Sequence, residues 1–187
     1  MNQIKIYVFG SCHFLGRLDN EDAVGNGGYG IIITSNGQSV EEISGGFSNT
    51  TNARMDIIGI TEGLKRIKVP SEIVVYLSNG YIIDALSKGW LEKWKKNGFK
   101  KIKHVDLWRK LDAVLQAISH SISFRHSRDV KNTHNFLHAE ELAKTISKEN
   151  NLPNDLSIGQ HNTTSLFAAT PQELNNEIEP FELEKDK

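Results

Sequence analysis

Hydrophobic and polar positions follow a strand-like period at the start of the chain. Residues 3–9 (QIKIYVF) alternate polar and apolar side chains, which is typical of a strand with one buried face, and residues 27–33 and 41–47 read as further strands. Between these last two, Ser35-Asn36-Gly37 predicts a tight hairpin turn, because Asn and Gly tolerate positive φ angles. We therefore expect two antiparallel hairpins to open the fold.

The pattern then changes to a helical period. Residues 52–67 place apolar side chains at helical spacing, and residues 73–77 (IVVYL) form the continuous apolar run of a strand buried on both faces. Helical segments are then expected at 81–86, 90–94, 105–118 and 135–147, with a short strand at 121–126. The order β-β-β-α-β-α-α-β-α predicts an α/β (mixed α+β) fold, in which a five-stranded mixed sheet with three leading antiparallel strands is flanked by helices.

The periodic pattern stops after Asn150. A chain of 187 residues suits one compact domain with some excess length, so we expect a domain over residues 1–150. Residues 151–187 carry Asn, Pro, Thr, Gln and Glu without periodicity, which predicts an acidic, mostly disordered tail with Phe167 or Phe181 as an anchor.

The sequence has no features typical of a membrane protein or a secreted protein. No run approaches the roughly 18 apolar residues of a membrane span, and the chain starts with a strand pattern in place of a signal peptide. Cys12 is the only cysteine, which excludes an internal disulfide and a cysteine-based zinc cluster. A cytoplasmic protein with no membrane partner is expected.

The net charge of −1 conceals an asymmetry. Residues 151–187 have a net charge of −5, and residues 1–150 have a net charge of +4. Within the basic part, the stretch from Lys88 to Lys103 contains seven lysines and a single acid, Glu92. The surplus is therefore one local patch, interleaved with aromatic residues, and it suits binding to nucleic acid.

Several short sequences on these elements resemble the bacterial type 1 ribonuclease H family. They are Gly10-Ser11-Cys12, Gly28-Tyr29-Gly30, residues 50–56 (TTNARMD), residues 88–99 (KGWLEKWKKNGF, similar to the basic protrusion of the family) and residues 105–108 (VDLW). The resemblance covers residues 4 to about 147. It implies a ribonuclease H-like fold and, for an intact site, cleavage of the RNA strand of an RNA/DNA hybrid with two Mg²⁺ ions held by four acids.

Two of those four acidic positions are neutral in this chain. Phe9 stands where the family has the acid that bridges both metals, and Ser78 stands at the third acid, with Asn79 as the alternative after a one-residue shift. Asp56 replaces the usual Glu of the first helix, and Glu140 matches the last acid. His126 is the candidate for the mobile histidine of the family.

The resemblance implies that the residues that contact the duplex are largely kept. The candidates are Ser11, Cys12, Thr51, Asn52, Trp90, Trp94, Lys95, Lys96, Lys100 and Lys101. Two polar side chains that contact the groove of the duplex in the family are absent, since Ala53 and Gly80 occupy those positions. Backbone groups near Ser11 and Cys12 would approach 2′-hydroxyls, and the aromatic and lysine residues would contact phosphates and sugars.

Our leading hypothesis is a ribonuclease H-like pseudoenzyme that binds RNA/DNA hybrid or double-stranded RNA and has lost most or all cleavage. No cofactor and no metal site are expected, although a weak cation site at Asp56 and Glu140 stays open. The first alternative is a working Mg²⁺- or Mn²⁺-dependent nuclease that draws further acids from the insert at 16–26, which contains Asp19, Glu21 and Asp22.

The second alternative is a protein-interaction module on the same scaffold, with a protein partner bound by the tail or the insert. A different hypothesis for the acidic tail, residues 151–187, is that it folds over the basic protrusion and competes with nucleic acid.

Overall fold

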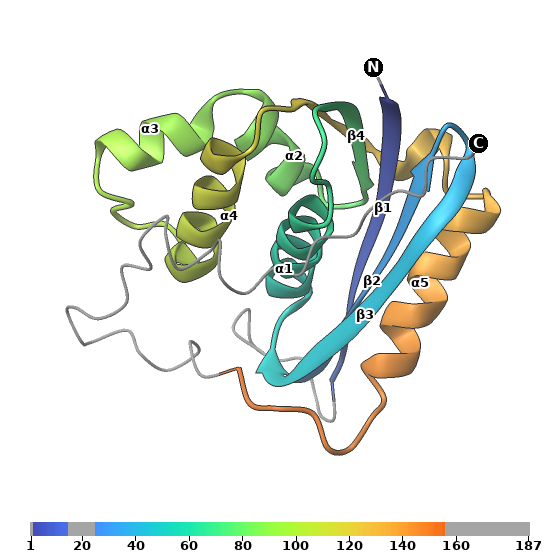
Figure 1. Cartoon of the computed structure of the whole chain (residues 1–187). Coiled ribbons are helices and arrows are strands. Elements are labelled where there is room, and N and C mark those ends of the chain that lie inside the picture. The colour runs from blue at the N-terminus through green and yellow to red at the C-terminus, as the bar shows by residue number, and fades with distance from the viewer. Residues whose placement is uncertain (1, 15–24, 156–187) are drawn as a thin grey trace.

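A computed structural model describes residues 2–14 and 25–155 of the chain (Figure 1). Its elements, in chain order, are β1 (Asn2–His13), β2 (Gly25–Ser35), β3 (Gln38–Thr50), α1 (Asn52–Lys65), β4 (Ser71–Leu77), α2 (Gly80–Ser87), α3 (Trp90–Lys96), α4 (Val105–Ala117), β5 (Ser121–His126), the 3₁₀ turn η1 (Ser127–Asp129) and α5 (His134–Ile146). The predicted order of strands is confirmed. Three helices, α2, α3 and α4, lie between β4 and β5, which matches the three helical segments expected there but is one more than the predicted order contains.

The five strands form one mixed sheet in the order β3-β2-β1-β4-β5. β1 pairs antiparallel with β2, and β2 with β3, while β4 lies parallel to both β1 and β5. Asn36 and Gly37 both adopt positive φ in the β2–β3 turn, as the Asn-Gly sequence predicts. The predicted mixed sheet with three leading antiparallel strands is therefore confirmed.

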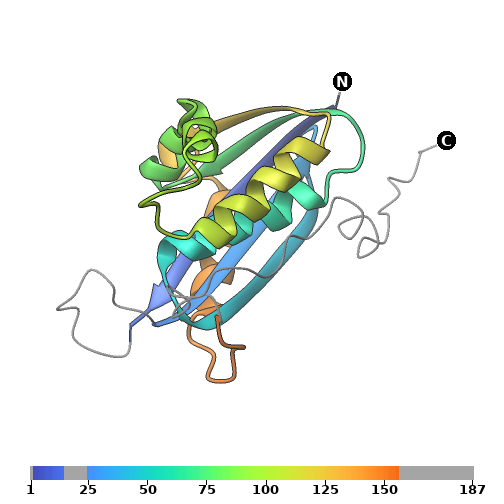
Figure 2. The same ribbon diagram turned by 90° about the vertical axis from the view of Figure 1, so that its left-hand side faces the viewer.

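Helices cover both faces of this sheet (Figures 1 and 2). The larger core lies on the side of α1 and α4, where Ile6 and Val8 of β1 pack with Ile60, Leu64 and other apolar side chains. A smaller apolar cluster lies on the α5 side. Its buried members are Tyr7, Ile32, Tyr76, Phe136 and Ala139. Because side chains alternate along a strand, β1 contributes to both cores.

The two glycines of the Gly28-Tyr29-Gly30 sequence are needed for the contact between β2 and α5. A Cβ atom on Gly28 would lie 2.3 Å from the carbonyl oxygen of Ala143, and one on Gly30 would lie 2.1 Å from that of Ala139. Both distances are far below van der Waals contact with rigid backbone. Glycine therefore lets α5 approach the sheet closely, and the residues of α5 are held at a fixed height above β1 and β2.

The predicted tail begins with a segment that contacts the domain. Residues 152–155, which we call the strap, lie along the end of β3. Ser48 N–H donates to the carbonyl oxygen of Pro153 at 2.8 Å, and Asp155 N–H donates to that of Ser48 at 2.9 Å. The strap forms an isolated parallel bridge between Ser48 and Asn154. The domain boundary after Asn150 stays a prediction, but the domain contacts extend to Asp155.

Two of the sequence predictions concern residues that the structure does not describe. The insert with Asp19, Glu21 and Asp22 falls largely within 15–24, and Phe167 and Phe181 fall within 156–187. In the described part of the chain, no helix is long and apolar enough to cross a membrane.

Candidate functional site

The candidate site lies where β1 extends past the end of β4. The last β1 residue paired with β4 is Tyr7, so the next backbone groups on that edge need other partners. Asp56, on the first turns of α1, supplies one of them. Its Oδ1 accepts a hydrogen bond from Gly10 N–H at 2.9 Å, and a Cβ atom on Gly10 would lie only 2.7 Å from the same oxygen.

The second oxygen of Asp56 is also occupied by the protein. Asn79 Nδ2 donates to Asp56 Oδ2 at 3.2 Å, while Asn79 Oδ1 caps α2 by accepting from Ile82 N–H at 3.4 Å. Asn79 thus joins α1 to the start of α2. It contacts Asp56, whereas Ser78, the other candidate for the third acidic position, is exposed.

Asp56 is deeply buried, with 4% of its surface exposed. Burial raises the pKa of Asp56 to about 7, against the opposing effects of the hydrogen bonds from Asn79 and Gly10. Close to neutral pH this carboxyl group is therefore only partly ionised. A neutral carboxyl is a poor ligand for a divalent cation, because the metal must first displace the proton.

Phe9 faces away from Asp56. Its ring packs edge-on against Phe136 of α5, with 5.8 Å between ring centroids, and it borders the smaller apolar cluster. Phe9 pairs with Gly30 of β2, so the glycine leaves room for α5 above the ring. The position of the predicted bridging acid is thus part of an apolar contact between β1 and α5.

The other residues predicted for a metal or catalytic role do not join Asp56. Glu140 lies on α5, on the opposite face of the sheet from α1, and pairs with Lys144 one turn later. His126 ends β5, and its Nδ1 accepts from Arg128 N–H at 3.2 Å. Within residues 2–14 and 25–155, no three His, Cys, Asp or Glu side chains gather as metal ligands would. The described donors do not fit a two-metal site.

The predicted aromatic residues of the protrusion lie together at the surface. Trp90 and Trp94 have centroids 6.4 Å apart, and Tyr81 of α2 lies 5.9 Å from each of them. Trp94 also meets the buried Trp108 edge-on at 5.1 Å. Tyr81 is 52% exposed. Its place in this cluster was not predicted from the sequence, because its neighbours in the cluster come from the next helix. The cluster is a platform that packs against the core through the half-buried Trp90 and Trp94 and exposes Tyr81.

The lysines of the protrusion fall into two groups. Lys95 forms ion pairs with Asp112 at 2.9 Å and Glu92 at 3.2 Å and is 27% exposed. In contrast, Lys96, Lys100 and Lys101 are exposed and have no ion-pair partner among the residues that the structure describes. Their charges are therefore available to a ligand. Lys95 as a binding residue stays a prediction, and its charge is compensated by Asp112 and Glu92 in this structure.

The predicted groove residues surround the start of α1. Thr51 caps the helix by accepting from Arg54 N–H at 3.3 Å, and Asn52 is exposed beside it. On β1, Ser11 Oγ lies 3.5 Å from Ser147 Oγ, and Cys12 Sγ donates to the carbonyl oxygen of Thr50 at 3.4 Å. Burial raises the pKa of Cys12 to about 11, so the thiol stays protonated and unreactive at neutral pH.

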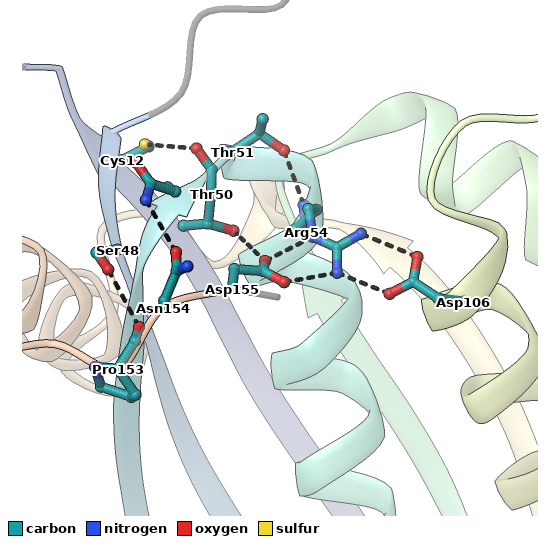
Figure 3. A network of polar contacts seen from close by, with 10 residues as sticks. Cys12, Ser48, Thr50, Thr51, Arg54, Asp106, Pro153, Asn154 and Asp155 are labelled. Atoms are coloured by element: carbon teal, nitrogen blue, oxygen red, sulfur yellow. Dashed lines mark hydrogen bonds and ion pairs between the residues drawn. The ribbon is translucent and has the colours of Figure 1, made fainter. Parts of the chain in front are cut away.

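A buried ion cluster beneath this turn was not predicted from the sequence (Figure 3). The Arg54 guanidinium is 2% exposed and binds two carboxylates. It donates to both oxygens of Asp106 at 2.9 and 2.7 Å, and to both oxygens of Asp155 at 2.6 and 2.9 Å. Thr50 Oγ1 also donates to Asp155, at 2.8 Å. The cluster joins the starts of α1 and α4 to the strap.

This fold is that of a ribonuclease H-like domain. The family model for RNase H matches residues 1–148. The chain therefore belongs to the RNase H family.

Relatives of the chain agree with that assignment. A ribonuclease H of Trichodesmium erythraeum (strain IMS101) is 34% identical over 163 residues, which cover 82% of this chain and 94% of the relative. A ribonuclease H of Caldicellulosiruptor saccharolyticus is 33% identical, with 80% and 99% covered. Both alignments span most of each chain.

Solved structures show the same fold. LC9-RNase H1, a type 1 RNase H with the type 2 active-site motif, superposes with a TM-score of 0.64 at 22% identity and covers 78% of this chain and 72% of its own. LC11-RNase H1, crystallised in complex with an RNA/DNA hybrid, gives a TM-score of 0.54 at 20% identity, with 83% and 99% covered.

Proposed function

We propose that this chain is a ribonuclease H-family protein that binds RNA/DNA hybrid or double-stranded RNA and has lost metal-dependent cleavage or retains it only weakly. The observation that carries the proposal is the state of the acidic positions. Phe9 is packed against Phe136, and both oxygens of the buried Asp56 carboxyl accept hydrogen bonds from the protein. Electrostatic stabilisation is usually the largest catalytic contribution, and half of its anionic scaffold is missing here.

The binding half of the proposal rests on the groove and the protrusion. Exposed lysines at 96, 100 and 101 stand beside the aromatic platform of Tyr81, Trp90 and Trp94. Lysines bind phosphates in a salt-dependent way, while aromatic faces pack on sugars or bases. Thr51 and Asn52 lie at the start of α1, where the family contacts the duplex. We extend to this chain the hybrid binding that is described for LC11-RNase H1.

Binding is tested by titrating labelled RNA/DNA hybrid, duplex RNA and duplex DNA at two salt concentrations. The proposal predicts tighter binding of the two RNA-containing duplexes than of DNA, and weaker binding of all three at the higher salt concentration. Equal and negligible binding of all three at low salt would contradict it.

Cleavage is tested separately, with hybrid, excess protein and either Mg²⁺ or Mn²⁺. The proposal predicts no products, or only traces with Mn²⁺. Efficient cleavage that Asp56→Ala abolishes would establish the alternative, a working nuclease. Cleavage that survives Asp56→Ala would identify a contaminating enzyme.

A further inference from the structure

The strap fixes the point at which the acidic C-terminal segment leaves the domain. Asp155, its last residue, is 7% exposed and is held by Arg54 and Thr50, while the backbone of the strap pairs with Ser48 of β3. These contacts join residues about a hundred positions apart in the sequence. The segment 156–187 therefore starts from a buried anchor on the domain.

This anchor lies close to the basic protrusion. One guanidinium nitrogen of Arg54 contacts both Asp155, at 2.9 Å, and Asp106, at 2.7 Å. Asp106 stands in the first turn of α4, only five residues after Lys101. Five residues span at most about 18 Å even when fully extended. Lys101 therefore lies within about 18 Å of Asp106, and Asp106 is joined through Arg54 to Asp155, where the acidic segment begins.

Charge and length both match the segment to this surface. Residues 156–187 contain six acids and two lysines, a net charge of −4. A segment of 32 residues spans up to about 110 Å at full extension, so its length does not prevent contact with Lys100 and Lys101. Tethering also gives the segment an effective concentration in the millimolar range, so a weak affinity is enough for occupancy.

We propose that residues 156–187 bind the exposed lysines of the protrusion, Lys96, Lys100 and Lys101, and thereby compete with a nucleic-acid duplex for the same surface. This inference rests on the proposed function, since it describes how that binding site is regulated. The acidic side chains act as a mimic of the phosphate backbone. The structure gives a reason for the inhibitor to be permanently close: the Arg54–Asp155 contact anchors it.

The test compares two full-length proteins. In the neutralised variant, Glu173, Glu177, Glu179, Glu182 and Glu184 become Gln and Asp186 becomes Asn; in the control variant, Gln160, Asn162, Gln172, Asn175 and Asn176 become Ser. At about 50 mM salt we expect the neutralised variant to bind labelled hybrid roughly tenfold more tightly than the wild type, and the control variant to match the wild type. The difference should disappear near 0.5 M salt, where charges are screened over about 4 Å.

A second measurement identifies the surface. In a protein that carries Lys100→Gln and Lys101→Gln, neutralising the tail should change hybrid affinity much less than tenfold, because the tail has lost its binding site. A synthetic peptide of residues 156–187 should also displace hybrid from the neutralised protein.

The two proposals can fail separately. Equal hybrid affinity of the wild-type and neutralised proteins at low salt would overturn the competition while leaving duplex binding intact. If neither protein binds any duplex, the proposed function fails, and the tail inference is then judged by titrating the peptide directly against the neutralised protein, where no binding would overturn it.

Discussion

Two regions of the domain, the end of β1 and the basic protrusion, differ in what their side chains offer to a ligand. At the end of β1, Phe9 packs against α5, and Asp56 is buried with its hydrogen bonds satisfied inside the protein. On the protrusion, Lys96, Lys100 and Lys101 stay exposed beside an aromatic platform. A site that holds divalent cations needs several ionised carboxylates with free lone pairs, whereas phosphate binding needs only exposed cations. In the proposed function, the first requirement is lost in this chain and the second is kept.

In the proposed function, Asp56 has a structural role in place of metal binding. Asp56 links Gly10 of β1 to Asn79 at the start of α2, and its contact with Gly10 satisfies a backbone donor of β1 beyond the last residue that pairs with β4. Fewer ionised carboxylates near the groove also reduce the repulsion of phosphate when no cation is bound. Loss of cleavage and retention of binding are therefore compatible within one fold.

The largest expected effect concerns Asp56 and pH. Its pKa is raised in the folded state to about 7, so the folded protein binds more protons than the unfolded chain between the two pKa values. This group's contribution to stability is therefore most favourable at acidic pH and is lost as pH rises toward and through 7. Relative to Asp56→Asn, the free energy of unfolding of the wild type should fall by roughly 2–3 kcal/mol between about pH 5 and pH 8. Urea titrations of both proteins measure this difference, and a difference that is independent of pH would show that Asp56 is ionised throughout.

The next largest effect concerns the exposed lysines of the protrusion and the binding of hybrid. In the protein with the neutralised tail, where the tail does not compete, Lys100→Gln with Lys101→Gln should weaken hybrid binding about twentyfold at low salt and lower the salt slope by about two, because two phosphate contacts are lost. The matched control is Lys5→Gln with Lys68→Gln, which removes the same charge from exposed positions away from the protrusion. Filter binding across a salt series separates the cases. If the control weakens binding as much, the attraction is a property of net charge alone.

The fold was predictable from the sequence. Strand and helix periods are local signals, and the Asn36-Gly37 turn sets the register of its hairpin, so the element order was predictable. The apolar nature of Phe9 was visible in the sequence, and its partner Phe136 was not, because the contact depends on how closely α5 approaches the sheet.

The features that could not be predicted depend on contacts between residues that are distant in the sequence. Asp155 and Arg54 are 101 residues apart, and the strap has no periodicity that would mark it. Lys95 is indistinguishable in sequence from Lys96, yet only Lys95 faces Asp112 of α4. Which groups donate to the two oxygens of Asp56 is likewise decided by the packing of β1 and α2 around it, which sequence spacing does not encode.

A smaller effect tests whether the apolar end can be returned to metal binding. Phe9→Asp with Ser78→Asp restores two carboxylates, and Phe9→Asn with Ser78→Asn removes the same ring contact without adding charge. At a Mn²⁺ concentration of about ten times the dissociation constant, the Asp variant should gain about 1.4 kcal/mol of stability, and the Asn variant should gain none. Unfolding titrations with Mn²⁺ and with chelator measure this. A wild type that is stabilised as much as the Asp variant would show that the chain already holds a cation.

The smallest expected effect separates two adjacent lysines on α3. Lys95 already pairs with Asp112 and Glu92, so a phosphate would have to compete with two carboxylates for its charge, whereas Lys96 is exposed without such partners among the described residues. In the protein with the neutralised tail, we expect Lys96→Gln to weaken hybrid binding about fivefold at low salt and Lys95→Gln to weaken it by about twofold or less. Because the two variants have the same charge and neighbouring positions, the comparison isolates the effect of ion pairing. Parallel titrations in one buffer measure it, and a larger loss with Lys95→Gln would show that the duplex displaces Asp112 and uses the inner lysine.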